Sequence, residues 1–169
     1  TKYVIYAPQA MPISNPYKMG NAWLVDNINL VNSANEEILS LGLDSLTNTV
    51  IVDKSTENAP TVKEYNSANG KIALIKYEPN CMTYKFTSTE DQLAVFSEIY
   101  YPDGWNAYIN DEEVPYFRAN YLLRAMELKA GDYTIEFRFE SKSYDIGKIL
   151  SIICSILLTT ALSCIIFAH

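Results

Sequence analysis

The chain has 169 residues and carries 20 acidic against 13 basic side chains, which gives a formal net charge of −7. This acidic balance argues against nucleic acid as a partner, because phosphate backbones are bound by basic residues. A single histidine, His169, excludes histidine-based zinc sites and Ser-His or Cys-His catalysis within the chain. Only Cys81 of the three cysteines lies outside the apolar C-terminal segment, so no disulfide framework is expected, and the absence of phosphate-loop and paired-cysteine motifs predicts no cofactor.

Residues 1–54 are predicted to form a small α/β appendage. Its expected elements are a strand over 22–32, a helix over 35–43 with Glu36 and Glu37 in its first turn, and a strand over 47–54. Residues 55–70 are polar, contain Pro60 and show little periodicity, so they are predicted to be a linker.

Residues 71–141 are predicted to form an antiparallel β-sandwich, which makes the fold mainly β. Short segments rich in β-branched and aromatic residues recur between turn signals, at 71–78, 82–87, 92–100, 105–109, 114–117, 121–128 and 132–140. The last segment, DYTIEFRFE, alternates strictly, so Phe137 and Phe139 are expected to face the core. The segment before it is expected to pair with it as a hairpin, and a second hairpin is expected around Asn110 and Asp111.

Residues 142–169 are predicted to be a juxtamembrane segment and one C-terminal transmembrane helix. From Ile149 to Ala168 the chain reads ILSIICSILLTTALSCIIFA, which at about 1.5 Å per residue spans the roughly 30 Å hydrocarbon core of a lipid bilayer. Small hydroxyl residues recur along one stripe of this helix, at Ser151, Ser155, Thr159 and Ser163. The stripe indicates packing against other transmembrane helices, although such residues are also simply tolerated in membrane helices. We therefore expect this chain to be part of a larger, polytopic protein.

The search for catalytic chemistry finds few candidates. Four carboxylates gather around turns, where solvated loop residues are the ordinary explanation and a general acid/base pair the alternative: Asp103, Asp111, Glu112 and Glu113. Aromatic residues are dense between positions 100 and 121, and we take Tyr101, Trp105 and Tyr108 as candidate ligand-binding residues, with core packing as the alternative. Arg118 and Arg124 flank this region and could bind a phosphate or carboxylate, with ion pairs to acidic residues as the alternative, and we take Arg118 as the candidate ligand-binding residue.

Two long strings carry a resemblance to a known family. The stretch GNAWLVDNINLVNSANEEI and the stretch LAVFSEIYYPDGWNAYINDEEVPYFRANYLLRAMELKAGDYTIEFRFESKSYDIGK, with the apolar helix after it, resemble the C-terminal end of YfhO-type bacterial membrane proteins. The similarity extends from Gly20 onward. Relatives usually carry Asp-Gly where this chain has Asn110 and Asp111, so a type I′ turn is expected to be more costly here.

The resemblance implies a large multi-pass protein of the bacterial cytoplasmic membrane, similar to lipid-phosphosugar-dependent glycosyltransferases of the GT-C class. It implies a role in glycosylating cell-envelope polymers, with the catalytic carboxylate in an early loop outside this chain, so the chain itself is expected to be non-catalytic. The soluble domain would be extracytoplasmic, whereas Lys142 and Lys148, which precede the helix, would place it in the cytoplasm by the positive-inside rule.

Three functions remain open at the level of the sequence. The first is an accessory domain that positions a glycan or envelope-polymer acceptor or supports the catalytic membrane bundle. The second is a membrane-anchored carbohydrate-binding module, which exposed coplanar aromatic rings would favour. The third is a purely structural or assembly domain, which buried tyrosines and the absence of a groove would favour.

Overall fold

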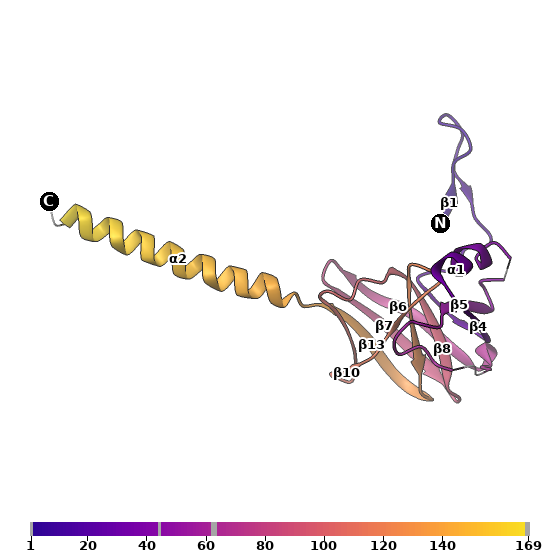
Figure 1. Ribbon diagram of the computed structural model, residues 1–169. Helices are drawn as coiled ribbons and strands as arrows, with labels where there is room; N and C mark the ends of the chain where they lie inside the picture. The colour runs from indigo at the N-terminus through magenta and orange to yellow at the C-terminus, as the bar shows by residue number, and fades with distance from the viewer. Residues whose placement is uncertain (1, 44, 62–63, 168–169) are drawn as a thin grey trace.

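The computed structural model describes residues 2–43, 45–61 and 64–167, and Figure 1 shows a β-rich domain from which one long helix projects. The elements in chain order are β1 (Tyr3–Val4), β2 (Ile13–Ser14), β3 (Ala22–Val25), β4 (Asn27–Val31), α1 (Ala34–Ser40), β5 (Thr49–Asp53), the 3-10 turn Ser67–Asn69, β6 (Gly70–Glu78), β7 (Cys81–Ser88), β8 (Gln92–Ile99), β9 (Trp105–Ile109), β10 (Glu112–Val114), β11 (Phe117–Ala119), β12 (Leu123–Leu128), β13 (Gly131–Phe139) and α2 (Lys142–Phe167).

The predicted mainly β fold is confirmed, and its core lies between two antiparallel sheets. One sheet has five strands in the order β10-β9-β13-β7-β6, and the other has four in the order β11-β12-β8-β3. Tyr84, Phe96 and Phe137 meet edge to face at the centre, with ring centroids 4.9 Å apart for Tyr84–Phe96 and for Phe96–Phe137. All three rings are fully buried, and such edge-to-face pairs add stability beyond the area they bury.

The expected hairpin between residues 121–128 and 132–140 is wrong. Strand β12 pairs with β8 and β11, whereas β13 pairs with β7 and β9, so the short connection after Leu128 crosses from one sheet to the other. Alternation fixes which face of a strand is apolar but not which strand lies beside it, and here Met126 and Ile135 meet across the core instead. The hairpin of β9 and β10 is confirmed, with positive φ angles of 52° at Asn110 and 65° at Asp111, as a type I′ turn requires.

Two further details of the predicted strands need correction. The segment 114–117 is divided, because β10 ends at Val114 and β11 begins at Phe117 in the other sheet, with Pro115 between them unable to donate to a ladder. Phe137 is fully buried as predicted, but Phe139 is 38% exposed, so the prediction for it is wrong. Phe139 is the last residue of β13, and its ring packs beside Trp105 and Gly104 at the end of the sheet.

The predicted α/β appendage forms a third layer on the outer face of the four-stranded sheet. β4 and β5 pair in parallel, and α1 connects them. Val50 and Val52 of β5 pack against Leu93 and Val95 of β8, so β8 is buried on both faces. The expected strand over 22–32 is interrupted at Asp26, and its first half, β3, pairs with β8 as part of the sandwich.

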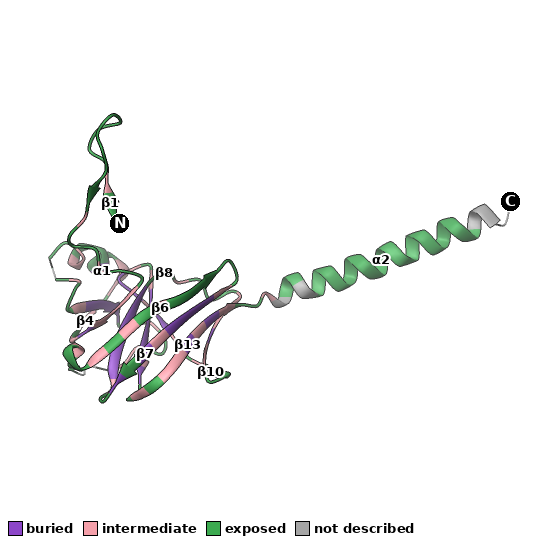
Figure 2. Ribbon diagram, turned by 180° about the vertical axis from the view of Figure 1, so that it is seen from behind, coloured by how far each residue is buried: buried purple, intermediate pink, exposed green. Residues whose placement is uncertain are grey.

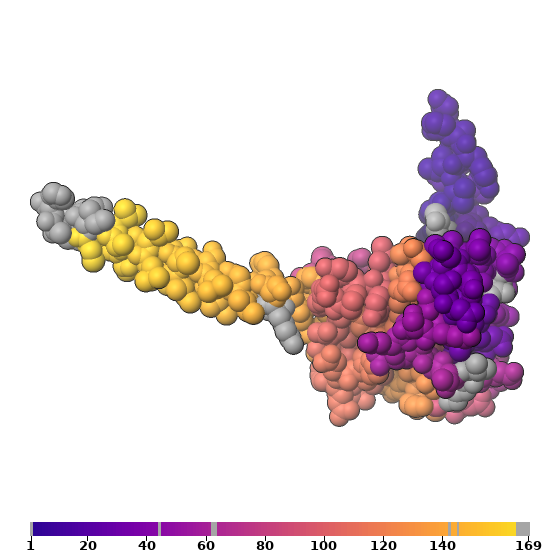
Figure 3. All heavy atoms as spheres, in the orientation of Figure 1, coloured from indigo at the N-terminus to yellow at the C-terminus, as the bar shows by residue number. Residues whose placement is uncertain are grey.

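The predicted C-terminal apolar helix is confirmed as α2. Among the described residues it is the one helix long and apolar enough to cross a membrane, from Ile146 to Cys164. Figure 2 shows that the described residues of α2 are exposed along the helix. Figure 3 shows that α2 and the N-terminal hairpin of β1 and β2 project from opposite sides of the domain. Helix α2 begins at Lys142, three residues after β13 ends, and its candidate membrane span begins at Ile146.

Candidate functional site

An aromatic groove lies at the end of the sandwich from which α2 departs. Trp105 opens β9 opposite Phe139, the last residue of β13, and Tyr100 follows β8. Tyr116 lies in the crossover after β10, donates a hydrogen bond of 2.8 Å to the carbonyl oxygen of Trp105, and meets the Tyr100 ring at 5.4 Å and 63°. The groove has a volume of about 500 Å³, and three aromatic rings line it, those of Tyr100, Trp105 and Tyr116. The other lining residues are Asn58, Pro102, Asn106, Ala107, Glu113, Val114 and Pro115.

A glycine sets the backbone beside this groove. Gly104 has a φ of +114°, and a Cβ atom there would lie 2.9 Å from the Phe139 ring. Its carbonyl oxygen accepts a hydrogen bond of 2.6 Å from the backbone N–H of Glu140, the residue after β13. The loop that carries the groove is therefore fixed to the strand that leads into the membrane helix.

Arg124 lies buried behind the Trp105 ring. Its guanidinium carbon is 4.6 Å from the Trp105 ring centroid and 5.1 Å from that of Phe137, and its side chain is 2% exposed. Its Nε donates to the carbonyl oxygen of Ile99 at 2.9 Å, while its Nη1 has no hydrogen-bond partner among the described residues. Burial lowers the pKa of the Arg124 guanidinium from its ordinary value, but guanidinium groups remain charged in proteins. The aromatic faces compensate part of the cost of burying this cation, which lies behind a ring that lines the groove.

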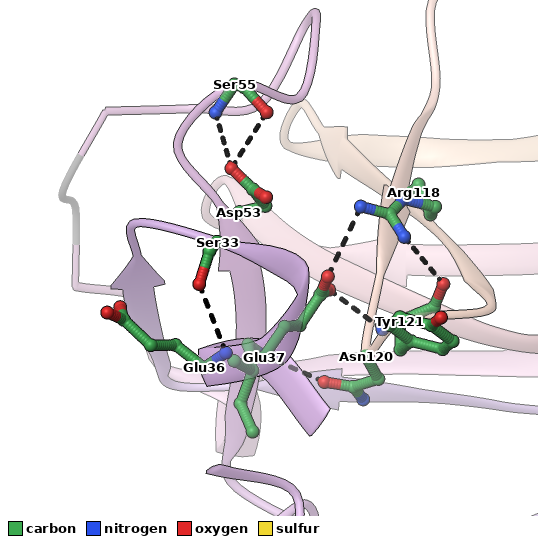
Figure 4. Close-up of polar contacts among 9 residues, drawn as sticks. Ser33, Glu36, Glu37, Asp53, Ser55, Arg118, Asn120 and Tyr121 are labelled. Atoms are coloured by element: carbon green, nitrogen blue, oxygen red, sulfur yellow. Dashed lines mark hydrogen bonds and ion pairs between the residues drawn. The ribbon is translucent and has the colours of Figure 1, made fainter. Parts of the chain in front are cut away.

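A second polar cluster joins the α/β layer to the sandwich, as Figure 4 shows. Glu37 of α1 is fully buried, and its Oε1 accepts a hydrogen bond of 2.8 Å from the backbone N–H of Tyr121. Its Oε2 lies 3.3 Å from Nη2 of Arg118. The other terminal nitrogen of Arg118, Nη1, donates to the carbonyl oxygen of Tyr121 at 3.0 Å. Burial is the main reason why the pKa of Glu37 is raised, and it outweighs the hydrogen bond from Tyr121 and the charge of Arg118. We call these three residues the Glu37 clamp.

The Glu37 clamp holds a turn that contains two left-handed residues without glycine. Asn120 and Tyr121 have φ angles of 46° and 69°. Asn120 is buried, its Oδ1 accepts a hydrogen bond of 2.8 Å from the N–H of Ile51, and its own N–H donates to the carbonyl oxygen of Ile51. A non-glycine pair in this region is costly, so these contacts indicate a turn that the surrounding structure stabilises.

The structure does not bring the four predicted ligand-binding residues together. Trp105 lines the aromatic groove, and Tyr101 is 51% exposed in the adjoining loop. Tyr108 lies on the outer face of the five-stranded sheet, where its hydroxyl donates to Glu140 at 2.6 Å and its ring lies 4.6 Å from the guanidinium carbon of Arg138. Arg118 belongs to the Glu37 clamp. The alternation of Trp105 and Tyr108 along β9 was a signal in the sequence that these two side chains face opposite ways.

The four turn carboxylates form no acid/base pair in the structure. Asp111, Glu112 and Glu113 are exposed at the β9–β10 hairpin, where Asp111 accepts a hydrogen bond of 2.6 Å from Arg138, and Asp103 is exposed in the loop before β9. Within residues 2–43, 45–61 and 64–167, no group of three or more His, Cys, Asp or Glu side chains is arranged to hold a metal ion.

The architecture defines a membrane-anchored β-domain with a small aromatic groove at its membrane end. The chain belongs to the bacterial membrane protein YfhO family, whose family model matches residues 24–151. The match covers both sheets of the sandwich from Leu24 onward, the α/β layer and the first turns of α2. A search of curated proteins found no match, and a search of solved structures found none either.

Proposed function

We propose that this chain is an extracytoplasmic accessory domain, with the last membrane helix, of a glycosyltransferase-like protein that glycosylates cell-envelope polymers. The observation that carries the proposal is the position of the aromatic groove, which opens beside the strand that leads directly into α2. A lipid-linked substrate is processed near the membrane surface, so a groove at this end is suitably placed for the acceptor. Membership of the YfhO family supports the membrane setting.

The chemistry of the groove supports a sugar-containing acceptor. Its tryptophan and tyrosine rings offer apolar faces for stacking, while Asn106 and Glu113 offer hydrogen-bonding groups for hydroxyls. The rings of Tyr100 and Tyr116 meet at 63° and are not coplanar, so a single residue held in a groove fits better than a long chain laid on a flat platform.

A purely structural role is the second candidate, and the Glu37 clamp favours it. The string VPYFRANYLLRA, which carries much of the family resemblance, places Arg118 and Tyr121 in contacts within the protein. In this case the domain would support the membrane bundle.

We further propose that α2 packs against other membrane helices through Ser151, Ser155, Thr159 and Ser163. The hydroxyls of Ser155, Thr159 and Ser163 already donate to carbonyl oxygens one turn earlier, so close approach at small residues would drive this packing.

Transfer assays on the purified full-length protein distinguish the two candidates. We expect Trp105→Phe to raise the KM for the acceptor several-fold with unchanged binding of the lipid-linked sugar donor, because the indole face is lost while Arg124 stays covered. Trp23→Phe is the matched control, since Trp23 is also half-buried but lies on β3, outside the groove. Unchanged acceptor kinetics in Trp105→Phe, with the protein correctly folded, would contradict the acceptor role and favour the structural one.

A further inference from the structure

We propose that the end of the β-domain next to α2 docks into the lipid headgroup layer of the same bilayer that α2 spans. Five large side chains with exposed apolar surface lie at this end, and we call them the apolar rim: Tyr77 (64% exposed), Ile99 (65%), Tyr101 (51%), Leu122 (53%) and Phe139 (38%). Exposed apolar side chains gathered at one end of a domain mark an interaction surface, whereas scattered ones do not.

Backbone hydrogen bonds place the rim residues at one end. The N–H of Phe139 donates to the carbonyl oxygen of Asn80 at 2.9 Å, which brings the β6–β7 turn, just after Tyr77, beside the end of β13. The N–H of Tyr100 donates to the carbonyl oxygen of Leu122 at 2.6 Å. Ile99 precedes Tyr100, and Tyr101 follows it. Tyr116 connects this region to the end of β13, because its ring meets Tyr100 at 5.4 Å and its hydroxyl donates to the carbonyl oxygen of Trp105, the partner of Phe139. The four-stranded sheet therefore contributes its residues at the same end.

The length of chain between the rim and the membrane selects lipid as the occupant. α2 begins at Lys142, and its candidate membrane span begins at Ile146. Four residues of helix rise about 6 Å, which is close to the thickness of one headgroup layer, roughly 5 to 8 Å. When the apolar part of α2 fills the hydrocarbon core, Lys142 therefore lies near the outer edge of the headgroup layer. The end of β13, three residues earlier, lies beside this edge, where the large side chains of the rim can reach into the layer. Figure 1 shows β13 running toward α2, which agrees with this placement.

The composition of the rim suits this layer. Tyrosine is enriched at membrane interfaces because its ring enters the apolar boundary while its hydroxyl stays hydrated. Tyr144, which is 69% exposed on the first turn of α2, lies at the same level. Since the chain carries a net charge of −7, anionic lipids do not attract it, and the contact depends on apolar burial instead. We therefore expect the contact to form on zwitterionic lipid and to be insensitive to salt.

Lipid quenching of tryptophan fluorescence tests the proposal on the whole chain in nanodiscs. The lipid is phosphatidylcholine with a fraction carrying a nitroxide on the headgroup. We expect Tyr101→Trp to add emission that the nitroxide quenches strongly. Ala130→Trp is the matched control at the far end of β13, because nine strand residues span about 30 Å. Equal quenching of the two added tryptophans would overturn the proposal.

A second variant separates lipid contact from contact with other parts of the protein. Adding Leu122→Asp to Tyr101→Trp is expected to reduce the quenching at least by half, while unchanged near-ultraviolet circular dichroism shows that the domain stays folded. The nanodisc contains no other membrane helices, so quenching there reports lipid alone. If Tyr101→Trp in the full-length protein is shielded from water but not quenched, other membrane helices cover the rim, and lipid docking is wrong.

Discussion

Replacing Glu37 tests whether the clamp stabilises the fold through its charge or through its hydrogen bond. Glu37→Ala removes the acceptor for the half-buried N–H of Tyr121, and a hydrogen bond to a charged group contributes about 1.5 to 3 kcal/mol. It also removes the pair with Arg118, whose side chain is 29% exposed, so that loss is about 0.2 to 1 kcal/mol. We expect Glu37→Ala to lower the free energy of unfolding by about 2 to 4 kcal/mol.

Glu37→Gln is expected to behave differently, because it keeps an acceptor for Tyr121 and removes only the charge. Burial raises the pKa of Glu37, so the folded protein holds the neutral carboxyl more readily than the unfolded chain does. Near neutral pH the glutamine variant should therefore be as stable as the wild type or slightly more stable. The stability that wild-type Glu37 gains from its proton is present below the ordinary pKa of 4.5 and is lost as the pH rises through its raised value in the folded protein.

Thermal unfolding in nanodiscs, followed by tryptophan fluorescence across mildly acidic and neutral pH, measures both effects. For a domain of this size each kcal/mol shifts Tm by about 2 to 4 °C, so Glu37→Ala gives a measurable decrease. Glu36→Ala is the matched control, because Glu36 is the exposed neighbour on the same helix and its carboxylate accepts from the backbone and the side chain of Asn32. Equal losses at Glu36 and Glu37, or a large loss in Glu37→Gln at neutral pH, would refute this account of the clamp.

Three further predictions concern packing, turn geometry and alkaline pH. Phe137→Ala should lower the free energy of unfolding by about 3 to 5 kcal/mol, and Phe139→Ala by clearly less, because only Phe137 is fully buried; denaturant unfolding compares them. Asp111→Ala should lower Tm more than Asp111→Gly. Both variants lose the ion pair with Arg138, but only glycine adopts the φ of 65° at this position freely. Burial raises the pKa of Tyr65 and Tyr133 to about 12, so stability should fall as the pH rises from 10 through 12, with tyrosinate absorbance appearing on unfolding.

The sequence predicted which face of each strand is buried better than it predicted which strands are neighbours. The alternation in β13 correctly placed Phe137 inside, because side-chain direction in a strand has a period of two, but it did not show that Phe139, at the end of the strand, is 38% exposed. The same alternation is satisfied whether β12 lies beside β13 or opposite it, so the hairpin prediction had no local signal to correct it. The continuous apolar run from Leu93 to Phe96 did carry a signal of burial on both faces, which the α/β layer accounts for.

The Glu37 clamp was beyond what local patterns predict. Tyr121 reads as the start of a strand, yet it adopts a left-handed conformation that is held by a carboxylate 84 positions earlier in the sequence. Nothing in the string RANYLL resembles a glycine turn, so only the tertiary contact determines the conformation. The prediction also grouped Trp105, which lines the groove, with Tyr108, which lies on the outer face of the sheet.

Trp105 combines a structural contact with a place in the groove, and this decides how its variants are interpreted. Its ring covers the buried guanidinium of Arg124, so removing the whole ring in Trp105→Ala would admit water to a cation that the fold keeps dry. A loss of acceptor handling in Trp105→Ala would then report on the fold as much as on the ligand. Trp105→Phe keeps an aromatic face over the guanidinium of Arg124, so its effect on acceptor kinetics reports on the lining of the groove. Strand β13 contacts both the groove and the cation before it leads into α2, because Phe137 lies beside the guanidinium of Arg124 and the N–H of Glu140 donates to Gly104.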